Sequence, residues 1–262
     1  MNLRLRLLIR LAVCLYFCGF AILTLWGGNF VTNLCLYKFS LSEDISLQAG
    51  FALAGITLSL SAFFFLFMKS WVLKLLALVP LLQGLFCLWP INGQNIDISA
   101  ACVHFFIAVW FYVLGRFVGN AYNYQRQTLG FIQYSMAFLF IAVSFLNFFI
   151  NQHDITYLQE YLQMVLDVAS FHKSVTVYLI YLLGFLNLMS GIMVLYRPRV
   201  LLIAYMVFFG GLLATSKIIT GVFHGYPDTL LRSIYFLIPI IYYSLASSNI
   251  EKKFFKNTKG HL

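Results

Sequence analysis

Eight long apolar runs divide this chain of 262 residues. The hydrocarbon core of a bilayer is about 30 Å thick, and a helix needs about 20 apolar residues to cross it. Each run is close to that length, and short gaps with polar and turn residues separate the runs. They predict an all-α membrane bundle with eight spans, at residues 8–27, 49–68, 71–89, 100–119, 131–150, 174–195, 200–222 and 230–248.

The charged residues are sorted between the gaps. Seven of the eight acidic residues lie in alternate gaps, and thirteen of the seventeen Lys and Arg residues lie in the others. Because Lys and Arg are enriched in the cytoplasmic loops of membrane proteins, this sorting predicts an even number of spans with both termini in the cytoplasm. The basic residues that fall on the acidic side are Lys38, Lys173, Lys217 and Arg232.

Composition limits the class of protein and its partners. Hydrophobic residues make up 62% of the chain and charged residues only 10%, whereas soluble domains carry about 25% charged residues. The net charge of +9 comes mostly from basic residues at the ends of the apolar runs, so we expect anchoring at a bilayer and no nucleic-acid partner. The expected location is a bacterial cytoplasmic membrane.

The gap between the fifth and sixth runs has a helical pattern of its own. Asp154 can cap a helix, and the apolar residues that follow recur at helical spacing opposite a polar face. This predicts an amphipathic helix near residues 155–169. Two positions remain open for it, on the outer membrane surface or over the ends of neighbouring spans. In both, it covers the outer mouth of the bundle.

An internal repeat is predicted from residues compared at a separation of 129. Gly55 then falls on Gly184, Ser61 on Ser190, and the basic turn at Lys69 on the turn at Pro198. The first spans match with a further shift of about six residues. We therefore expect two parallel four-helix units, residues 1–125 and 126–250, followed by a basic cytoplasmic tail at 251–262.

This layout resembles the DoxX-like family of membrane proteins. The resemblance rests on the start IRLAV at residues 9–13, on Gly19 in the first span, on a polar outer gap, and on the tight basic turn LYRPR at 195–199. Near the start of the second span, where that family often has an acid, this chain has Gln48. The resemblance implies an accessory membrane subunit and, as a cofactor, a quinone.

Ionisable residues inside or beside spans are the candidate site, because they are costly in a membrane and usually functional. On the acidic side they could hold an anionic headgroup or polarise a quinone carbonyl. The alternative is that Lys217 and Arg232 extend to the surface or pair with Asp228. The candidates are Lys217, Arg232, His104, His224 and Asp228.

Three kinds of uncharged residue carry further predictions: polar residues within the spans, small residues, and aromatic residues near the span ends. Gln83, Asn147 and Asn187 add polar groups in the outer or middle part of the spans. We expect small residues to serve helix packing, namely Gly184, Ser190 and Gly191. Aromatic residues near span ends predict interface belts, namely Trp26, Trp71, Trp89, Tyr37, Tyr196, Tyr226, Tyr242 and Tyr243.

Two functions follow from these patterns. The first is a non-catalytic integral subunit that scaffolds a membrane complex and offers a quinone or lipid site in its outer half. The second is a transporter or lipid-handling membrane enzyme that uses the outer cationic cluster. Ser216, Lys217 and Ser244 have neither the Ser-x-x-Lys nor the Gly-x-Ser-x-Gly setting of a hydrolase, and the cysteines show no metal-ligand spacing, which favours the first. A single intramembrane histidine, His104, argues against a b-type haem.

Overall fold

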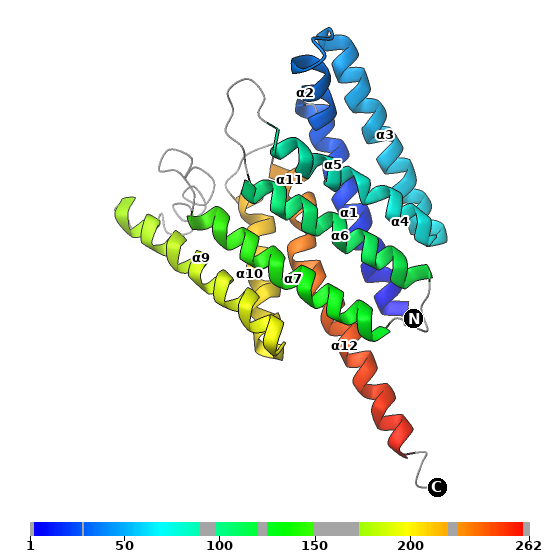
Figure 1. Ribbon diagram of the computed structural model, residues 1–262, viewed down its shortest axis with the longest axis vertical. Helices are drawn as coiled ribbons and strands as arrows, with labels where there is room; N and C mark the ends of the chain where they lie inside the picture. Colours follow the sequence, from blue (N-terminus) through cyan, green and yellow to red (C-terminus); the bar gives the residue numbers. More distant parts are fainter. Residues whose placement is uncertain are drawn as a thin grey trace.

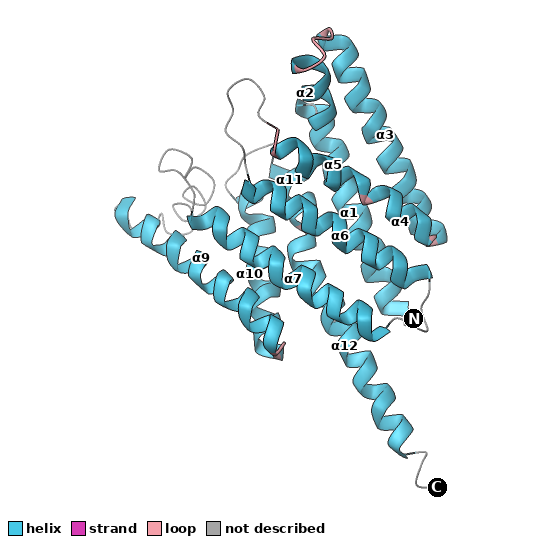
Figure 2. Cartoon of the chain, viewed as in Figure 1, coloured by secondary structure: helices cyan, strands magenta, loops and turns pink. Residues whose placement is uncertain are grey.

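The computed structural model describes residues 3–27, 29–89, 98–119, 125–148, 173–219 and 225–258. Within these ranges every regular element is an α-helix (Figure 2), which confirms the all-α prediction. The described helices are α1 (Leu3–Gly27), α2 (Phe30–Tyr37), α3 (Glu43–Phe67), α4 (Ser70–Leu76), α5 (Leu78–Cys87), α6 (Ile98–Gly119), α7 (Gln125–Phe148), α9 (Lys173–Tyr196), α10 (Val200–Ile219), α11 (Gly225–Arg232) and α12 (Ile234–Thr258).

The long helices lie along the apolar runs, and α4 and α5 together lie along one of them. Six stretches of the described chain are long and apolar enough to cross a membrane, which gives the protein the build of a multi-pass membrane protein. Helices α7 and α10 contribute shorter apolar stretches over the described residues, Leu129–Phe145 and Val200–Thr215. The amphipathic helix predicted near residues 155–169 lies outside the described residues.

Helix α2 is an element that hydropathy alone did not indicate. Asn29 begins it, because the Asn29 side chain accepts hydrogen bonds from the backbone N–H groups of Val31 and Thr32. Its Nδ2 group donates to Thr24 Oγ1 at 3.2 Å and to the Gly50 carbonyl at 3.0 Å. A Cβ at Gly50 would overlap the Thr32 hydroxyl. One asparagine thus joins α1, α2 and α3.

The two halves of the chain use the same packing scheme (Figure 1). In the first half, α1 packs against α3, and α6 packs against α4 and α5. In the second half, α7 packs against α9, and α10 packs against α11 and α12. Across the middle, α6 packs on α7 while α1 packs on α11 and α12. Helices α3 and α9 therefore lie at opposite edges of the molecule.

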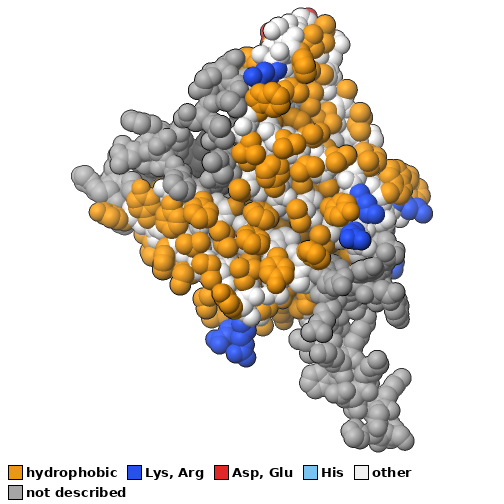
Figure 3. Space-filling model, viewed as in Figure 1, with side chains coloured by type: hydrophobic (Ala, Val, Ile, Leu, Met, Phe, Trp, Pro, Cys, Tyr) orange, Lys and Arg blue, Asp and Glu red, His pale blue; other side chains and the backbone are white. Residues whose placement is uncertain are grey.

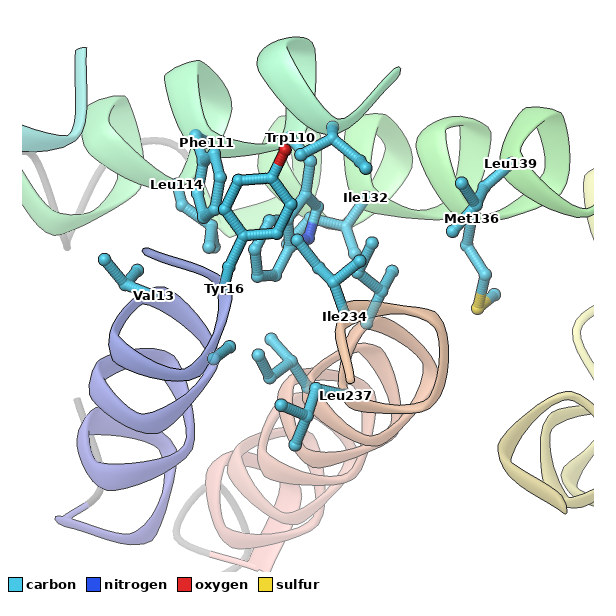
Figure 4. Close-up of a cluster of buried hydrophobic side chains, with 14 of the residues drawn as sticks. Val13, Tyr16, Trp110, Phe111, Leu114, Ile132, Met136, Leu139, Ile234 and Leu237 are labelled. Carbon is cyan, nitrogen blue, oxygen red and sulfur yellow. The ribbon is translucent and has the colours of Figure 1, made fainter. Parts of the chain in front are cut away.

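The largest buried side chains lie where the halves meet. Figure 4 shows this cluster between α1, α6, α7 and α12. Tyr16 and Phe17 pack against Phe111 with ring centroids 5.3 Å and 5.4 Å from its ring. Because both halves contribute to one core, neither half buries its apolar side chains alone. The labelled members are Val13, Tyr16, Trp110, Phe111, Leu114, Ile132, Met136, Leu139, Ile234 and Leu237.

The buried positions of one half recur in the other. In α3 and α9 the separation is 130 residues, one more than that of the sequence identities. Gly55 is exposed with open space around it, whereas Gly184 packs against Asn147 and Phe148, so that identity does not mark equivalent positions. The corresponding buried residues are Gly50, Ala54, Thr57, Ser61 and Phe64 in α3, and Ile180, Gly184, Asn187, Gly191 and Val194 in α9.

In other helices too, buried positions recur at a fixed separation along the chain. Buried residues of α4 and α5 correspond to those of α10 at the same separation of 130, and those of α1 correspond to those of α7 at 123. Leu73, Leu76, Val79, Pro80 and Gly84 match Ile203, Met206, Phe209, Gly210 and Ala214. Ile9, Ala12, Val13, Tyr16 and Phe17 match Ile132, Ser135, Met136, Leu139 and Phe140.

Small residues hold α7 and α9 together, as predicted. A Cβ at Gly191 would lie 2.7 Å from the Ala137 carbonyl oxygen and 2.7 Å from Ile141 Cγ1, so only glycine permits this approach. Ser190 is buried beside it and donates to the Leu186 carbonyl. Close backbone approach through small residues is the usual way in which membrane helices associate.

The outward faces of the helices are apolar (Figure 3). Exposed aromatic residues lie at both ends of this surface, as in interface belts. Trp71 and Trp89 are about half exposed, and their 18-residue separation corresponds to about 27 Å of helix, close to one hydrocarbon core. The prediction for Tyr242 was wrong, because this ring is buried and its hydroxyl donates to Gln133 Oε1 at 3.4 Å.

Candidate functional site

The structure divides the predicted cationic site between two places. Lys217 belongs to α10, and Asp228 and Arg232 belong to α11, which packs directly on α10. Asp228 and Arg232 are four residues apart and so share one face of α11. Arg232 is half-buried. His224, like the side chains of Lys217 and Asp228, lies outside the described residues.

His104 is not brought to that pair of helices. It is a half-buried residue of α6, which packs against α4, α5 and α7. Among the described helices, α11 instead packs against α1, α10 and α12. The sequence placed His104 at the same depth as the other candidates, but depth along a helix does not determine which helices are neighbours.

A different group of polar side chains lies in the second half, between α7, α9 and α10. Asn147 is 5% exposed and Asn187 is fully buried. Tyr205 of α10 donates its hydroxyl hydrogen to Asn187 Oδ1 at 3.0 Å. Asn147 and Asn187 lie on adjoining helices, and the Cβ of Asn147 lies 3.1 Å from the Cβ position of Gly184, one turn before Asn187. We call Asn147, Asn187 and Tyr205 the amide site.

Both amide donors of this site lack an acceptor. The Nδ2 atoms of Asn147 and Asn187 are buried, and neither has a hydrogen-bond partner among the residues that the structure describes. A buried donor without a partner costs about 1–3 kcal/mol. Since most buried polar groups in proteins are bonded, two such donors on adjoining helices call for an explanation.

The first half offers the matched comparison. By the correspondence of buried positions, Thr24 of the first half is equivalent to Asn147 of the second, and Thr57 is equivalent to Asn187. The Thr24 hydroxyl donates to the Phe20 carbonyl, and the Thr57 hydroxyl donates to the Ala54 carbonyl. Thr24 also accepts from Asn29. The same positions are therefore satisfied internally in one half, while donors remain open in the other.

Open amide donors suit a ligand that brings an acceptor oxygen. Carboxamide N–H groups donate to carbonyl oxygens, and both a quinone ring and a lipid ester carry such carbonyls. Aromatic rings adjoin the site, because Phe148 Cε1 lies 3.2 Å from the Cβ position of Gly184 and the Phe148 ring lies 6.4 Å from that of Tyr181. The residues present thus fit a quinone by donor type, and they fit a lipid carbonyl equally well.

No family model, curated protein or solved structure matches this chain. The resemblance to DoxX-like proteins therefore stays a prediction, and the function has to be argued from this molecule's own residues.

The sequence pointed to part of the amide site. Asn147 and Asn187 are polar residues within apolar runs, and such residues tend to face a bundle interior. The sequence does not indicate Tyr205, because a tyrosine in an apolar run has no distinguishing signal until its hydroxyl partner is known. The other polar candidate, Gln83, is half-buried on α5, away from α9 and α10, and its Oε1 has no partner among the described residues.

Proposed function

We propose that this chain is a non-catalytic, DoxX-like integral membrane subunit that binds an apolar ligand through a carbonyl oxygen. The observation that carries the proposal is the pair of buried amide donors, Asn147 and Asn187. In this proposal the ligand is a quinone or a lipid, and the protein scaffolds a complex in a bacterial cytoplasmic membrane. Asn147 and Asn187 donate to the carbonyl, and Tyr205 orients the Asn187 amide through its Oδ1.

The ligand site is tested by binding. A quinone with a ten-carbon tail and a phosphatidylethanolamine are titrated separately into detergent-solubilised protein and followed by native mass spectrometry. Asn147→Leu and Asn187→Leu should each weaken binding of one of these ligands about tenfold, because each removes one donor worth about 1.4 kcal/mol. Thr57→Val, at the matched position of the first half, should leave affinity unchanged. Equal affinity of all four proteins for both ligands would sink the proposal.

The same proposal includes eight spans in two duplicated units with both termini in the cytoplasm. It is supported by the recurring buried positions and by the distribution of charge. The basic residues Lys69, Lys74 and Arg116 lie at one end of the helices, and Glu43 and Asp44 lie at the opposite end of α3. The duplication accounts for the first half packing like the second.

Labelling tests this orientation. In a variant without native cysteines, Ser42→Cys should react with a membrane-impermeant maleimide in intact cells. Lys69→Cys, at the other end of α3, should react only after the membrane is opened. Labelling of both, or of Lys69→Cys alone, would rule out the orientation.

Assembly with partner proteins is the scaffold part of the proposal. Purification in a mild detergent should retain other membrane proteins in stoichiometric amounts. A lone monodisperse monomer would contradict it.

A transporter or lipid-handling enzyme is the second candidate. It is favoured by the packing of α10 on α11, which brings the helices that carry Lys217, Asp228 and Arg232 together. In that case Lys217→Ala and Arg232→Ala should each abolish binding of an anionic lipid on the acidic side while the protein stays folded in detergent.

A further inference from the structure

A cluster of basic side chains lies where α3 ends, α4 begins and α6 ends. Lys69 is the residue before α4, Lys74 lies in the last turn of α4, and Arg116 lies in the last turn of α6. All three are exposed. Figure 3 shows Lys and Arg side chains gathered at this corner of the molecule. We call these three residues the basic corner.

A glycine brings the two helices of this corner together. A Cβ at Gly115 would lie 3.0 Å from the Ser70 carbonyl oxygen and 3.2 Å from Lys74 Cγ. The stem of Lys74 therefore lies against α6 one residue before Arg116. Two basic residues thus belong to closely packed helices, and their backbone positions are fixed by that packing.

No carboxylate balances this charge among the acidic side chains that the structure describes. Those are Glu43 and Asp44, in the first turn of α3. Phe67, the last residue of α3 and the end that adjoins Lys69, follows Glu43 by 24 residues of helix, or about 35 Å. At that distance even weakly screened charges interact little. Among the described side chains, no carboxylate therefore compensates the positive charge of the basic corner.

An exposed aromatic surface continues from the basic corner along the helices. Phe63 lies 4.7 Å from Phe67 and 6.0 Å from Trp71, measured between ring centroids. Trp71 is 50% exposed and Phe67 is 58% exposed. Trp71 is three residues before Lys74 and so lies on the same side of α4. Positive charge at the helix ends and apolar rings further along match a phosphate headgroup and its acyl chains.

The second half lacks this combination at the corresponding place. At the separation of 130, it has Arg199 for Lys69 but Ala204 for Lys74. Helices α6 and α12 correspond at a separation of 131, at which the buried Val103, Ile107 and Trp110 fall on the buried Ile234, Ile238 and Ile241. Arg116 then falls on Ser247. The aromatic residues Phe63 and Trp71 correspond to Met193 and Leu201. Arg197 and Arg199 are enough for a positive-inside signal. The additional cations and rings of the first half exceed what orientation requires.

We propose that Lys69, Lys74 and Arg116, with the rings of Phe63, Phe67 and Trp71, form a binding site for one anionic phospholipid of the leaflet at that end of the bundle. The proposal rests on the membrane placement of the proposed function but not on the amide site. Arg116 offers a planar pair of donors to a phosphate and the lysines add point charges. Clusters of basic residues at the ends of membrane helices attract anionic lipids in this way.

The test measures binding of phosphatidylglycerol and phosphatidylcholine to the full chain in detergent by native mass spectrometry. Each Lys or Arg near a membrane surface contributes about fivefold in affinity, so Lys69→Gln/Lys74→Gln/Arg116→Gln should bind phosphatidylglycerol roughly a hundredfold more weakly. Arg197→Gln/Arg199→Gln is the matched control and should bind like the parent protein. Phosphatidylcholine should bind weakly to all three proteins.

A fluorescence measurement keeps the proposal testable if the triple variant folds poorly. In Trp26→Phe/Trp89→Phe the remaining tryptophans are Trp71 and the fully buried Trp110. Phosphatidylglycerol with brominated chains should quench Trp71 more than brominated phosphatidylcholine does, and the added change Lys74→Gln should reduce that difference. Equal quenching by both lipids would overturn the site. It would also be overturned if Arg197→Gln/Arg199→Gln lost as much phosphatidylglycerol binding as Lys69→Gln/Lys74→Gln/Arg116→Gln does. A failure to find ligand binding at the amide site would not affect the phospholipid site at the basic corner.

Discussion

The two halves of this protein bury the same positions and differ in their polar groups. In the first half, the Asn29 amide donates hydrogen bonds to the Thr24 hydroxyl and the Gly50 carbonyl, and its side chain also caps α2. In the second half, Asn147 and Asn187 keep open donors. Apolar packing tolerates many side chains of similar size, whereas a polar group needs a particular partner. A common scaffold can therefore be kept while each half takes a different binding role.

The largest expected difference between the halves concerns glycine. Gly191→Val should lower the free energy of unfolding by about 3 kcal/mol, because the new side chain meets the α7 backbone at Ala137. Gly55→Val, where no atom lies within 4 Å, should change it by less than about 0.5 kcal/mol. Unfolding in mixed micelles by titration with sodium dodecyl sulfate measures both. Equal losses would show that the α7–α9 contact is not as close as described.

The asparagines should respond in opposite directions. Asn29→Ala should cost about 2 kcal/mol of unfolding free energy, since it removes the cap of α2 and two further hydrogen bonds. Asn147→Leu should leave ligand-free stability unchanged or raise it, because it removes a buried donor that has no partner. The same micelle titration compares them. A large loss for Asn147→Leu would mean that its amide is bonded within the protein.

The smallest expected difference concerns the first helix of each half. Gln133 Nε2 donates to the Val194 carbonyl at 2.7 Å and to the Leu195 carbonyl at 3.2 Å. At the matched position, the half-buried Arg10 donates from Nη2 to the Leu66 carbonyl at 3.4 Å, in a hydrogen bond exposed to the surface. Gln133→Leu should therefore cost about 1 kcal/mol and Arg10→Met less than that. Thermal unfolding followed by circular dichroism gives the order, and a reversed order would break the comparison.

Much of the fold could be predicted from the sequence, because hydropathy is a local property. The described helices include six apolar stretches of membrane length and two shorter ones along the predicted runs, and Gly184 and Gly191 pack as small residues should. Helix α2 was missed because hydropathy does not register a helix cap, and this helix of eight residues begins where the Asn29 side chain bonds the N–H groups of Val31 and Thr32. Tyr242 was misplaced because it lies near the end of a run, while its ring faces Gln133 of another helix.

The candidate site was less predictable. Charge within a span points to residues such as Lys217, Arg232 and His104, but it does not say which helices adjoin. Packing places α10 beside α11 and leaves α6 with other neighbours. Asn147 and Asn187 stand out in the sequence as polar residues within apolar runs, but only the structure shows that Tyr205 bonds Asn187 and that both amide donors stay open. Lys74 becomes informative only through its contact with Gly115.

The sequence by itself determined that the chain is a bundle of apolar helices with its basic residues sorted between alternate gaps. Length and polarity of each run suffice for that, because every membrane helix satisfies its own backbone hydrogen bonds. Tertiary structure decided the register between the halves, at 130 and not 129 residues in α3 and α9. It also decided which polar groups are paired, because a hydrogen bond depends on the position of its partner, and here most of the deciding partners lie on a different helix.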